Sequence, residues 1–192
     1  MHRLPLLDML RRYSSRYPDE AEMLARIRHL VESAPDCFQR TCRPGHITGS
    51  AWVLSHDRTK CLLLHHRKLD RWLQPGGHAD GQTEIQQVAL REAEEESGLT
   101  QLALLGDCQD LVPLDIDVHK IPARFDAASN MTEDAHEHHD IRFLVVAGAN
   151  QELVLSEESH DLRWFTNQEV LQVTQEESVL RMMRKAGPHK NG

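Results

Sequence analysis

The hydrophobic positions at the start of the chain recur at helical spacing. They predict one helix over residues 4–17 and a second over residues 20–33, for which Asp19 is the expected N-cap. The inward-facing side chains are Leu6, Leu7 and Leu10 in the first helix and Met23, Ile27, Leu30 and Val31 in the second. We therefore expect a helical N-terminal extension, residues 1–42, ahead of a main domain, residues 43–192.

The main domain begins with alternating positions and short apolar runs, which indicate β-strands. The expected strands cover residues 47–55, 60–67, 72–78, 102–108, 115–121, 141–147 and 161–165. A polar loop is expected at residues 122–132, and two closing helices at residues 167–172 and 175–185. This mixture of strands and helices predicts an α/β or α+β fold.

A glycine-rich loop runs into the strongest helical pattern of the chain. Thr83 and Gln86 have the spacing of a capping box, and Gly98 is expected to end the helix as its C-cap. The core-facing stripe changes from apolar to acidic one heptad later: its members are first Ile85, Val88 and Ala89, and then Glu92, Glu95 and Glu96. Because these glutamates are spaced i, i+3 and i+4, their carboxylates converge on one face of the helix.

Three convergent carboxylates need compensation, because like charges at this spacing repel and half-burying them costs several kcal/mol. Either the glutamates form a solvated acidic face, or they bind a hard divalent cation, which prefers clustered oxygen ligands. The phase of the pattern favours the cation, because the acids continue the core-facing stripe and not the opposite face.

Residues 77–99 resemble the Nudix box, G-x5-E-x7-R-E-U-x-E-E-x-G-U, in which U is a bulky apolar residue. The residues in register are Gly77, Arg91, Glu92, Glu95, Glu96, Gly98 and Leu99. The sequence departs from the box at two positions. Thr83 stands where the box has its first glutamate, and Glu84 follows one position later. Ala93, which is small, stands at the first U position. The chain is thus similar to the MutT-like Nudix hydrolase superfamily.

The resemblance implies the Nudix fold, an α/β/α sandwich around a mixed sheet. It implies a metal-assisted attack of water on the pyrophosphate bond of a nucleoside diphosphate linked to another moiety. Glu92, Glu95 and Glu96 would then be ligands of Mg²⁺ or Mn²⁺, with Glu95 or Glu96 also serving as the base. Arg91 would orient these carboxylates. In the family the first box glutamate pairs with this arginine, so Thr83 leaves the bracing of Arg91 as the open question.

Other residues are candidates for catalysis or substrate contacts. In the family a further carboxylate often precedes a strand that contains tryptophan, and Glu158 matches that place by its distance from Trp164, with Glu157 as the neighbouring alternative. Glycines let the backbone approach a phosphate closely. The proposed substrate contacts are Gly76, Gly77, His78 and Arg67, of which Arg67 is alternatively part of a solvated basic strand end.

Two polar groups have more than one interpretation. Asp117 and His119 point to the same side of a strand, which favours a hydrogen-bonded pair over a site. His136, Glu137 and His138 invite a zinc interpretation, but no cysteine is near and their spacing matches no common zinc pattern. We therefore favour a polar rim beside the cleft, where a histidine contacts substrate or assists proton transfer.

Composition narrows the function. A net charge of −8 argues against a general nucleic-acid surface, so the expected substrate is a small molecule. The chain has no apolar run of about 20 residues and no secretory signal, and its four cysteines form no C-x-x-C pair, so we expect a cytoplasmic protein with reduced thiols. The helical extension packs on the main domain and is a candidate for a homodimer contact or a wall over the substrate.

The sequence leaves the substrate open. Few aromatic side chains are available for base stacking, and the candidates are Trp52, Trp72, Phe125 and Phe143. One alternative is an isopentenyl diphosphate isomerase, which needs a catalytic cysteine; Cys61, on an apolar strand, is a poor candidate. A second alternative is a non-catalytic Nudix-like binding or regulatory module, which would usually lose box glutamates that this chain retains.

Overall fold

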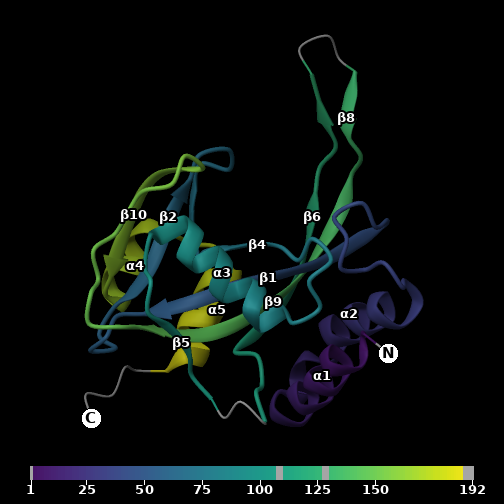
Figure 1. Cartoon of the computed structure of the whole chain (residues 1–192), viewed down its shortest axis with the longest axis horizontal. Coiled ribbons are helices and arrows are strands. Elements are labelled where there is room, and N and C mark those ends of the chain that lie inside the picture. Colours follow the sequence, from purple (N-terminus) through teal and green to yellow (C-terminus); the bar gives the residue numbers. More distant parts are fainter. Residues whose placement is uncertain (1, 107–109, 127–129, 188–192) are drawn as a thin grey trace.

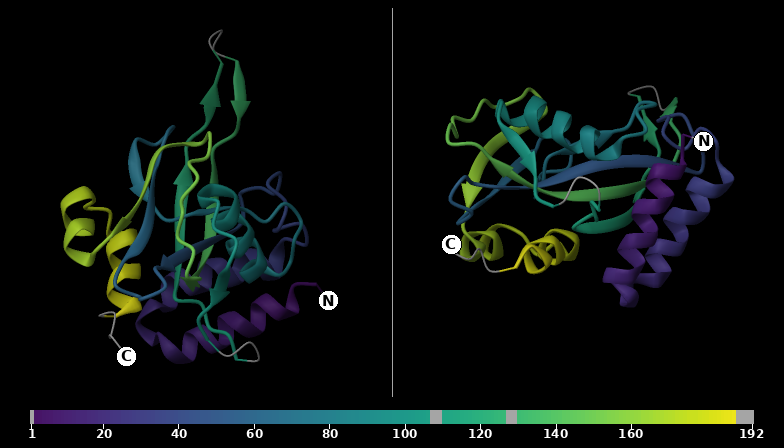
Figure 2. Two further views of the ribbon diagram at one scale, coloured as in Figure 1. Left: turned by 60° about the vertical axis from the view of Figure 1, so that its left-hand side comes forward. Right: turned by 60° about the horizontal axis from the view of Figure 1, so that its bottom comes forward.

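The computed structural model describes residues 2–106, 110–126 and 130–187. A mixed β-sheet lies between helices (Figure 1). Helix α3 (Ile85–Ser97) covers one face, and α4 (Asn167–Val173) and α5 (Glu177–Ala186) cover the other, as the right-hand view of Figure 2 shows. This arrangement confirms the expected α/β/α sandwich.

The sheet is built around β1 (Gly45–Leu54), which runs parallel to β9 (His136–Ala147). The strand order is β10-β2-β1-β9-β5, and in addition β3 pairs with β2, β4 with β1 and β6 with β9. All pairs in this sheet other than β1 with β9 are antiparallel. The remaining strands are β2 (Cys61–His66), β3 (Arg71–Leu73), β4 (Gly76–His78), β5 (Leu102–Leu104), β6 (Asp115–Ile121) and β10 (Ser159–Phe165).

Both faces of β1 are buried, because its alternating side chains enter two different cores. Ile47 and Val53 belong to the core that includes α3, whereas Trp52 belongs to the core that includes α4 and α5. Gly49 allows α3 to lie close to the strand, since a Cβ there would be only 3.0 Å from the carbonyl oxygen of Ile85. The box helix is thereby held directly over the centre of the sheet.

The N-terminal extension is a helical hairpin of α1 (Leu4–Arg16) and α2 (Ala21–Ser33). It packs beside β6 at one side of the sheet (Figure 2). The expectation that Asp19 caps the second helix is wrong. A short 3-10 helix, Pro18–Glu20, leads directly into α2, so Glu20 occupies the N-cap position and makes no side-chain cap hydrogen bond.

The capping box predicted at the start of the box helix is also wrong. Helix α3 begins at Ile85, with Glu84 at the N-cap and no side-chain cap hydrogen bond, so Thr83 lies outside the helix. The expected C-cap is confirmed. Gly98 has a left-handed φ of 73°, and its N–H donates to the carbonyl oxygen of Glu94. Glycine adopts this conformation without the steric cost that other residues bear.

Several strand boundaries differ from expectation. The strand predicted at residues 72–78 is divided into β3 and β4 around Pro75, which has no N–H to donate to a ladder. The predicted loop 122–132 contains β7 (Arg124–Phe125) and β8 (Met131–Glu133), which pair with each other. Strand β9 begins at His136 and not at residue 141, because β1 and β6 pair with its polar first half on both sides.

Part of the strand expected at residues 102–108, including Cys108, falls outside the described residues; β5 covers Leu102–Leu104. Within the described ranges, no helix combines the length and the apolar character that a membrane crossing requires.

Candidate functional site

The glycine-rich strand β4 lies against the acidic half of α3. The backbone N–H of Gly76 donates a hydrogen bond to Oε2 of Glu96, with a distance of 2.9 Å. A Cβ at Gly77 would overlap the carboxylate of Glu92. Two of the three box glutamates therefore contact β4, and only residues without side chains allow the strand to come this close.

Burial and neighbouring negative charges both act on the carboxylate of Glu96. Burial raises the pKa of Glu96 to about 8, although the hydrogen bond from Gly76 opposes this rise. The negative charges of Glu92, Glu158 and Glu95 raise the pKa of Glu96 further. Glu158, from a distant part of the chain, thus acts on the same carboxylate as Glu92 and Glu95.

Arg91 connects the helix to β4. Its Nη1 lies 2.7 Å from Oε1 of Glu92 and 3.2 Å from Oε2 of Glu95, and its Nη2 donates a 3.0 Å hydrogen bond to the carbonyl oxygen of His78. Burial raises the pKa of Glu92, and the Arg91 charge opposes this shift. Arg91 is therefore braced by groups other than the missing first box glutamate.

Thr83 stands at the position of that missing glutamate and lines a groove between α1 and the start of α3. Apart from Leu111, the other residues that line this groove come from the N-terminal extension and from α3 and its approach, and they include Asp8, Arg12, Glu84 and Gln86. In this chain the position contributes to the junction with the extension.

Glu158 and Arg67 are joined by their backbones. The N–H of Arg67 donates to the carbonyl oxygen of Glu158, with a distance of 3.0 Å, and Nη2 of Arg67 donates to the carbonyl oxygen of Ser159. Both residues are exposed. Glu157 is exposed in the same turn. The end of β2 and the turn before β10 thus hold Arg67 and Glu158 side by side.

His78 does not join the box carboxylates. Successive side chains of a strand point to opposite sides, so His78 points away from the α3 side that Gly77 faces. Its ring lies 5.1 Å from the ring of His46 and 5.0 Å from that of His138, centre to centre. The predicted substrate contact at His78 is thus part of a separate group of histidines, whose members are too far apart in the sequence for their spacing to reveal it.

The expected pairing of Asp117 with His119 is present, with a distance of 3.2 Å between Oδ2 and Nδ1. Asp117 also belongs to a buried ion-pair network. Arg142 is almost fully buried and lies 2.8 Å from Asp140, 3.1 Å from Asp115 and 3.2 Å from Asp117. This network connects β6 to β9 through the ion pairs of Arg142 with Asp115 and Asp117.

Of the four candidate aromatic residues, Trp52 and Phe143 are buried in the cores and are not available to a ligand. Trp72 packs edge-on against Phe165 beside the core under α4 and α5. Phe125 remains exposed, with 61% of its surface accessible.

The oxygen-rich group on α3 fits a hard divalent cation. Carboxylate oxygens are the ligands that Mg²⁺ and Mn²⁺ prefer. The mutual repulsion that contributes to the high pKa of Glu96 would be relieved by a cation between the carboxylates.

Comparisons with known proteins agree with this geometry. The family model of the NUDIX domain matches residues 45–185. This match begins near the predicted boundary at residue 43, although the division of the chain into two parts stays a prediction. A comparison with curated proteins gave no match.

Solved structures with a similar fold include three from different organisms. A NUDIX-family hydrolase from Clostridium perfringens has a TM-score of 0.56 at 22% identity, covering 73% of this chain and 95% of that chain. An Ap4A hydrolase of C. elegans in a binary complex has a TM-score of 0.52 at 19% identity, covering 72% and 93%. A Nudix hydrolase from M. Smegmatis, RenU, has a TM-score of 0.50 at 18% identity, covering 72% and 82%. At these identities the likeness establishes the fold alone.

Proposed function

The chain belongs to the NUDIX domain family, and from this premise we propose that it hydrolyses the pyrophosphate bond of a nucleoside diphosphate linked to another moiety. The observation that carries this proposal is the contact of Glu92 and Glu96 with the glycines of β4, together with Glu95, which Arg91 connects to Glu92. A diphosphate is a dense negative charge, and clustered carboxylates would repel it unless cations lie between them.

Glu92, Glu95 and Glu96 are the residues that would hold Mg²⁺ or Mn²⁺. When bound, such an ion neutralises charge on the phosphate oxygens and lowers the pKa of a coordinated water. Arg91 keeps the carboxylates of Glu92 and Glu95 in place through its ion pairs with both.

In the proposed reaction, a water oxygen forms a bond to one phosphorus, and the bond from that phosphorus to the bridging oxygen breaks. The proton of the water passes to a carboxylate, for which Glu95, Glu96 and Glu158 are the candidates, and two phosphorylated products leave. Gly76 and Gly77 are the proposed backbone contacts of a phosphate, because glycine lets the backbone approach a ligand closely. Arg67, whose N–H donates to the carbonyl oxygen of Glu158, is the candidate cation for a phosphate oxygen.

Two alternative functions are less well supported. The isomerase alternative needs a reactive cysteine, but Cys61 is fully buried and burial raises the pKa of its thiol to about 12. A non-catalytic module would have no use for a complete set of metal carboxylates. Cytoplasmic location and a homodimer through the helical extension stay predictions from the sequence.

The test is a substrate panel with Mg²⁺ or Mn²⁺ that contains nucleotide sugars, dinucleotide cofactors, dinucleoside polyphosphates and oxidised nucleotides. The assay would include Glu96→Gln, with Glu94→Gln as the matched control, because Glu94 is exposed on another side of the same helix. We expect the wild type to cleave at least one class of substrate. Glu96→Gln should lose this activity, whereas the control Glu94→Gln should retain it. Failure to cleave any member of the panel, or turnover of isopentenyl diphosphate without cleavage, would overturn the proposal.

A further inference from the structure

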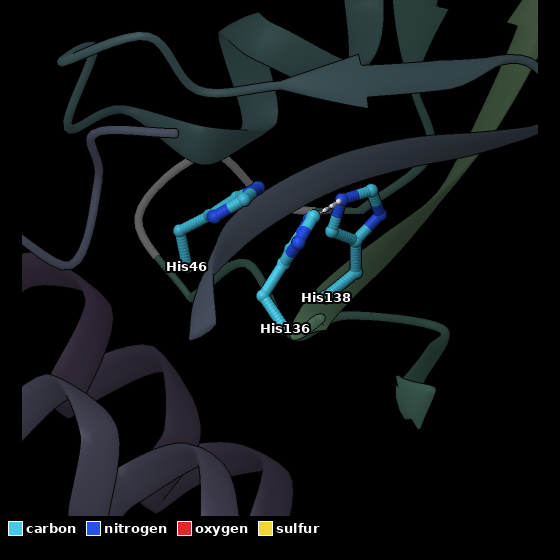
Figure 3. Close-up of side chains that lie close together, drawn as sticks. All are labelled: His46, His136 and His138. Carbon is cyan, nitrogen blue, oxygen red and sulfur yellow. Dashed lines mark hydrogen bonds between the residues drawn. The ribbon is translucent and has the colours of Figure 1, made fainter. Parts of the chain in front are cut away.

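Three histidine side chains lie close together (Figure 3). His46 points to the face of the sheet opposite to that of its neighbour Ile47, which packs in the core that includes α3. His46 comes from the start of β1, and His136 and His138 come from the start of β9. The parallel register places His46 directly opposite His138. One nitrogen atom from each of the three rings lies within 4.8 Å of the others.

We propose that His46, His136 and His138 form a metal site separate from the Nudix box, which takes a divalent transition-metal ion such as Zn²⁺. Imidazole nitrogen suits zinc, copper, nickel and iron, whereas Mg²⁺ prefers oxygen. Zinc in proteins is usually four-coordinate and tetrahedral, so the three histidines would be completed by a fourth ligand. The inference does not depend on the proposed hydrolase activity.

The strongest observation is the state of His46. Only 1% of its surface is exposed, and neither of its ring nitrogens makes a hydrogen bond of normal geometry. A buried polar group without a partner costs about 1–3 kcal/mol. The lone pair of one nitrogen would find its partner in a metal ion shared with the two neighbouring rings.

His136 is already oriented as a ligand. Its Nδ1 lies 2.8 Å from the carbonyl oxygen of Asp134, an acceptor, so Nδ1 carries the proton and Nε2 has a free lone pair. Such a hydrogen bond on the far nitrogen is the usual support of a metal-binding histidine. Nε2 of His136 lies 3.3 Å from Nε2 of His138. Two nitrogen ligands of a tetrahedral ion are separated by about 3.3 Å when each metal–nitrogen bond is about 2.0 Å.

Burial lowers the pKa of two of the three histidines. Burial lowers the pKa of His46 to about 3, and positive charge on His78, His136 and Arg43 acts in the same direction. A contact with the Cys42 backbone opposes this lowering. Burial likewise lowers the pKa of His138 to about 2, and the neighbouring histidines add to the effect. Burial therefore disfavours a positive charge on these two rings.

A carboxylate stands next to the site. Oε1 of Glu133 lies 3.7 Å from Nε2 of His136, which places a negative charge where a bound cation would need one. His78 and His119 complete the surroundings, since each ring lies within 5.3 Å of the His138 ring, centre to centre. Glu133 is thus the candidate for the fourth position.

The test uses full-length protein without a polyhistidine tag, stripped of metal and titrated with Co²⁺ in excess Mg²⁺. Mg²⁺ occupies oxygen sites, so the strong visible absorption of tetrahedral cobalt reports the histidine site. We expect one equivalent to bind to the wild type and Zn²⁺ to displace it. His46→Ala and His138→Ala should each weaken binding by at least about 100-fold, since even outer partners of a metal site contribute 10- to 100-fold.

The matched control is His29→Ala, because His29 is exposed on α2 and should bind Co²⁺ as the wild type does. Thermal unfolding in the presence of a chelator checks that each variant is folded, and Zn²⁺ should raise the Tm of the wild type but not that of His138→Ala. Absence of tetrahedral cobalt absorption in the wild type would overturn the inference. Wild-type affinity in both folded His46→Ala and His138→Ala would do so as well.

Discussion

Gly76 and Glu96 are joined by a hydrogen bond of 2.9 Å from the backbone N–H of the glycine to Oε2 of the glutamate. The bond connects the glycine-rich strand β4 to the acidic half of α3, twenty residues later in the sequence. The position of the carboxylates is therefore coupled to the position of β4, where a phosphate would lie according to the proposed function.

The first prediction concerns the box glutamates. Glu95→Gln and Glu96→Gln should each lower kcat by about 100-fold or more, because each removes a proposed ligand of the catalytic metal. In Glu96→Gln the side-chain amide oxygen would still accept the hydrogen bond from Gly76, so the fold should persist. Steady-state kinetics on the best substrate of the panel would measure the effect, and a variant with full activity would remove that residue from the metal site.

A second prediction concerns the close approach of Gly77 to Glu92. In Gly77→Ala the new methyl group would overlap the Glu92 carboxylate, and we expect the free energy of unfolding to fall by about 1–3 kcal/mol, as for other overpacked positions. Urea denaturation would measure it. The loss should be smaller when Gly77→Ala is introduced into Glu92→Ala, and equal losses in both backgrounds would contradict this explanation.

The third prediction concerns Arg142, whose guanidinium is buried among three aspartates. Arg142→Met would leave those carboxylates without their central partner, and breaking a buried pair in this way costs about 3–5 kcal/mol. Arg163→Met is the control, since Arg163 is paired with Asp161 on the surface and such pairs contribute about 0–1 kcal/mol. Similar urea midpoints for the two variants would refute the assignment.

The fourth prediction is the acid response of the same network. Burial alone would raise the pKa values of Asp115 and Asp117, but hydrogen bonds and the charges of Arg142 and Arg181 outweigh it and lower both. The stability from a lowered carboxyl pKa is complete above the unfolded-state value of about 3.9 and is lost as the pH falls through the folded-state value.

The free energy of unfolding should therefore fall as the pH is lowered below about 4. Asp117→Asn, which cannot titrate, should have a shallower acid slope than the wild type. Chemical denaturation at a series of pH values measures both slopes, and parallel curves for the two proteins would show that Asp117 does not contribute.

The sequence by itself was sufficient for the features that depend on neighbours along the chain. The i, i+3, i+4 spacing predicted that the carboxylates of α3 converge, because helix geometry fixes which side chains share a face. Gly98 was identified as the helix end for a similarly local reason. The motif at residues 77–99 also indicated the family. The alternating and helical spacing of the hydrophobic residues indicated the α/β class, because this spacing can be read from the sequence alone.

Other local signals failed where tertiary structure competed with them. Asp19 is not the N-cap of α2, because the short 3-10 helix that contains it leads directly into α2. Thr83 is not the N-cap of α3, because that helix begins only at Ile85. The polar first half of β9 had no strand pattern of its own. It is a strand because β1 and β6 supply hydrogen-bond partners on both sides.

Only the tertiary structure could bring His46 to His136 and His138. These residues are far apart in sequence, and their proximity depends on the parallel register of β1 and β9, in which a shift by one residue would turn every side chain to the opposite face. That register is set by the packing of the whole sheet between its helices. Within a helix the chain determines its own geometry, whereas between distant strands the common core decides.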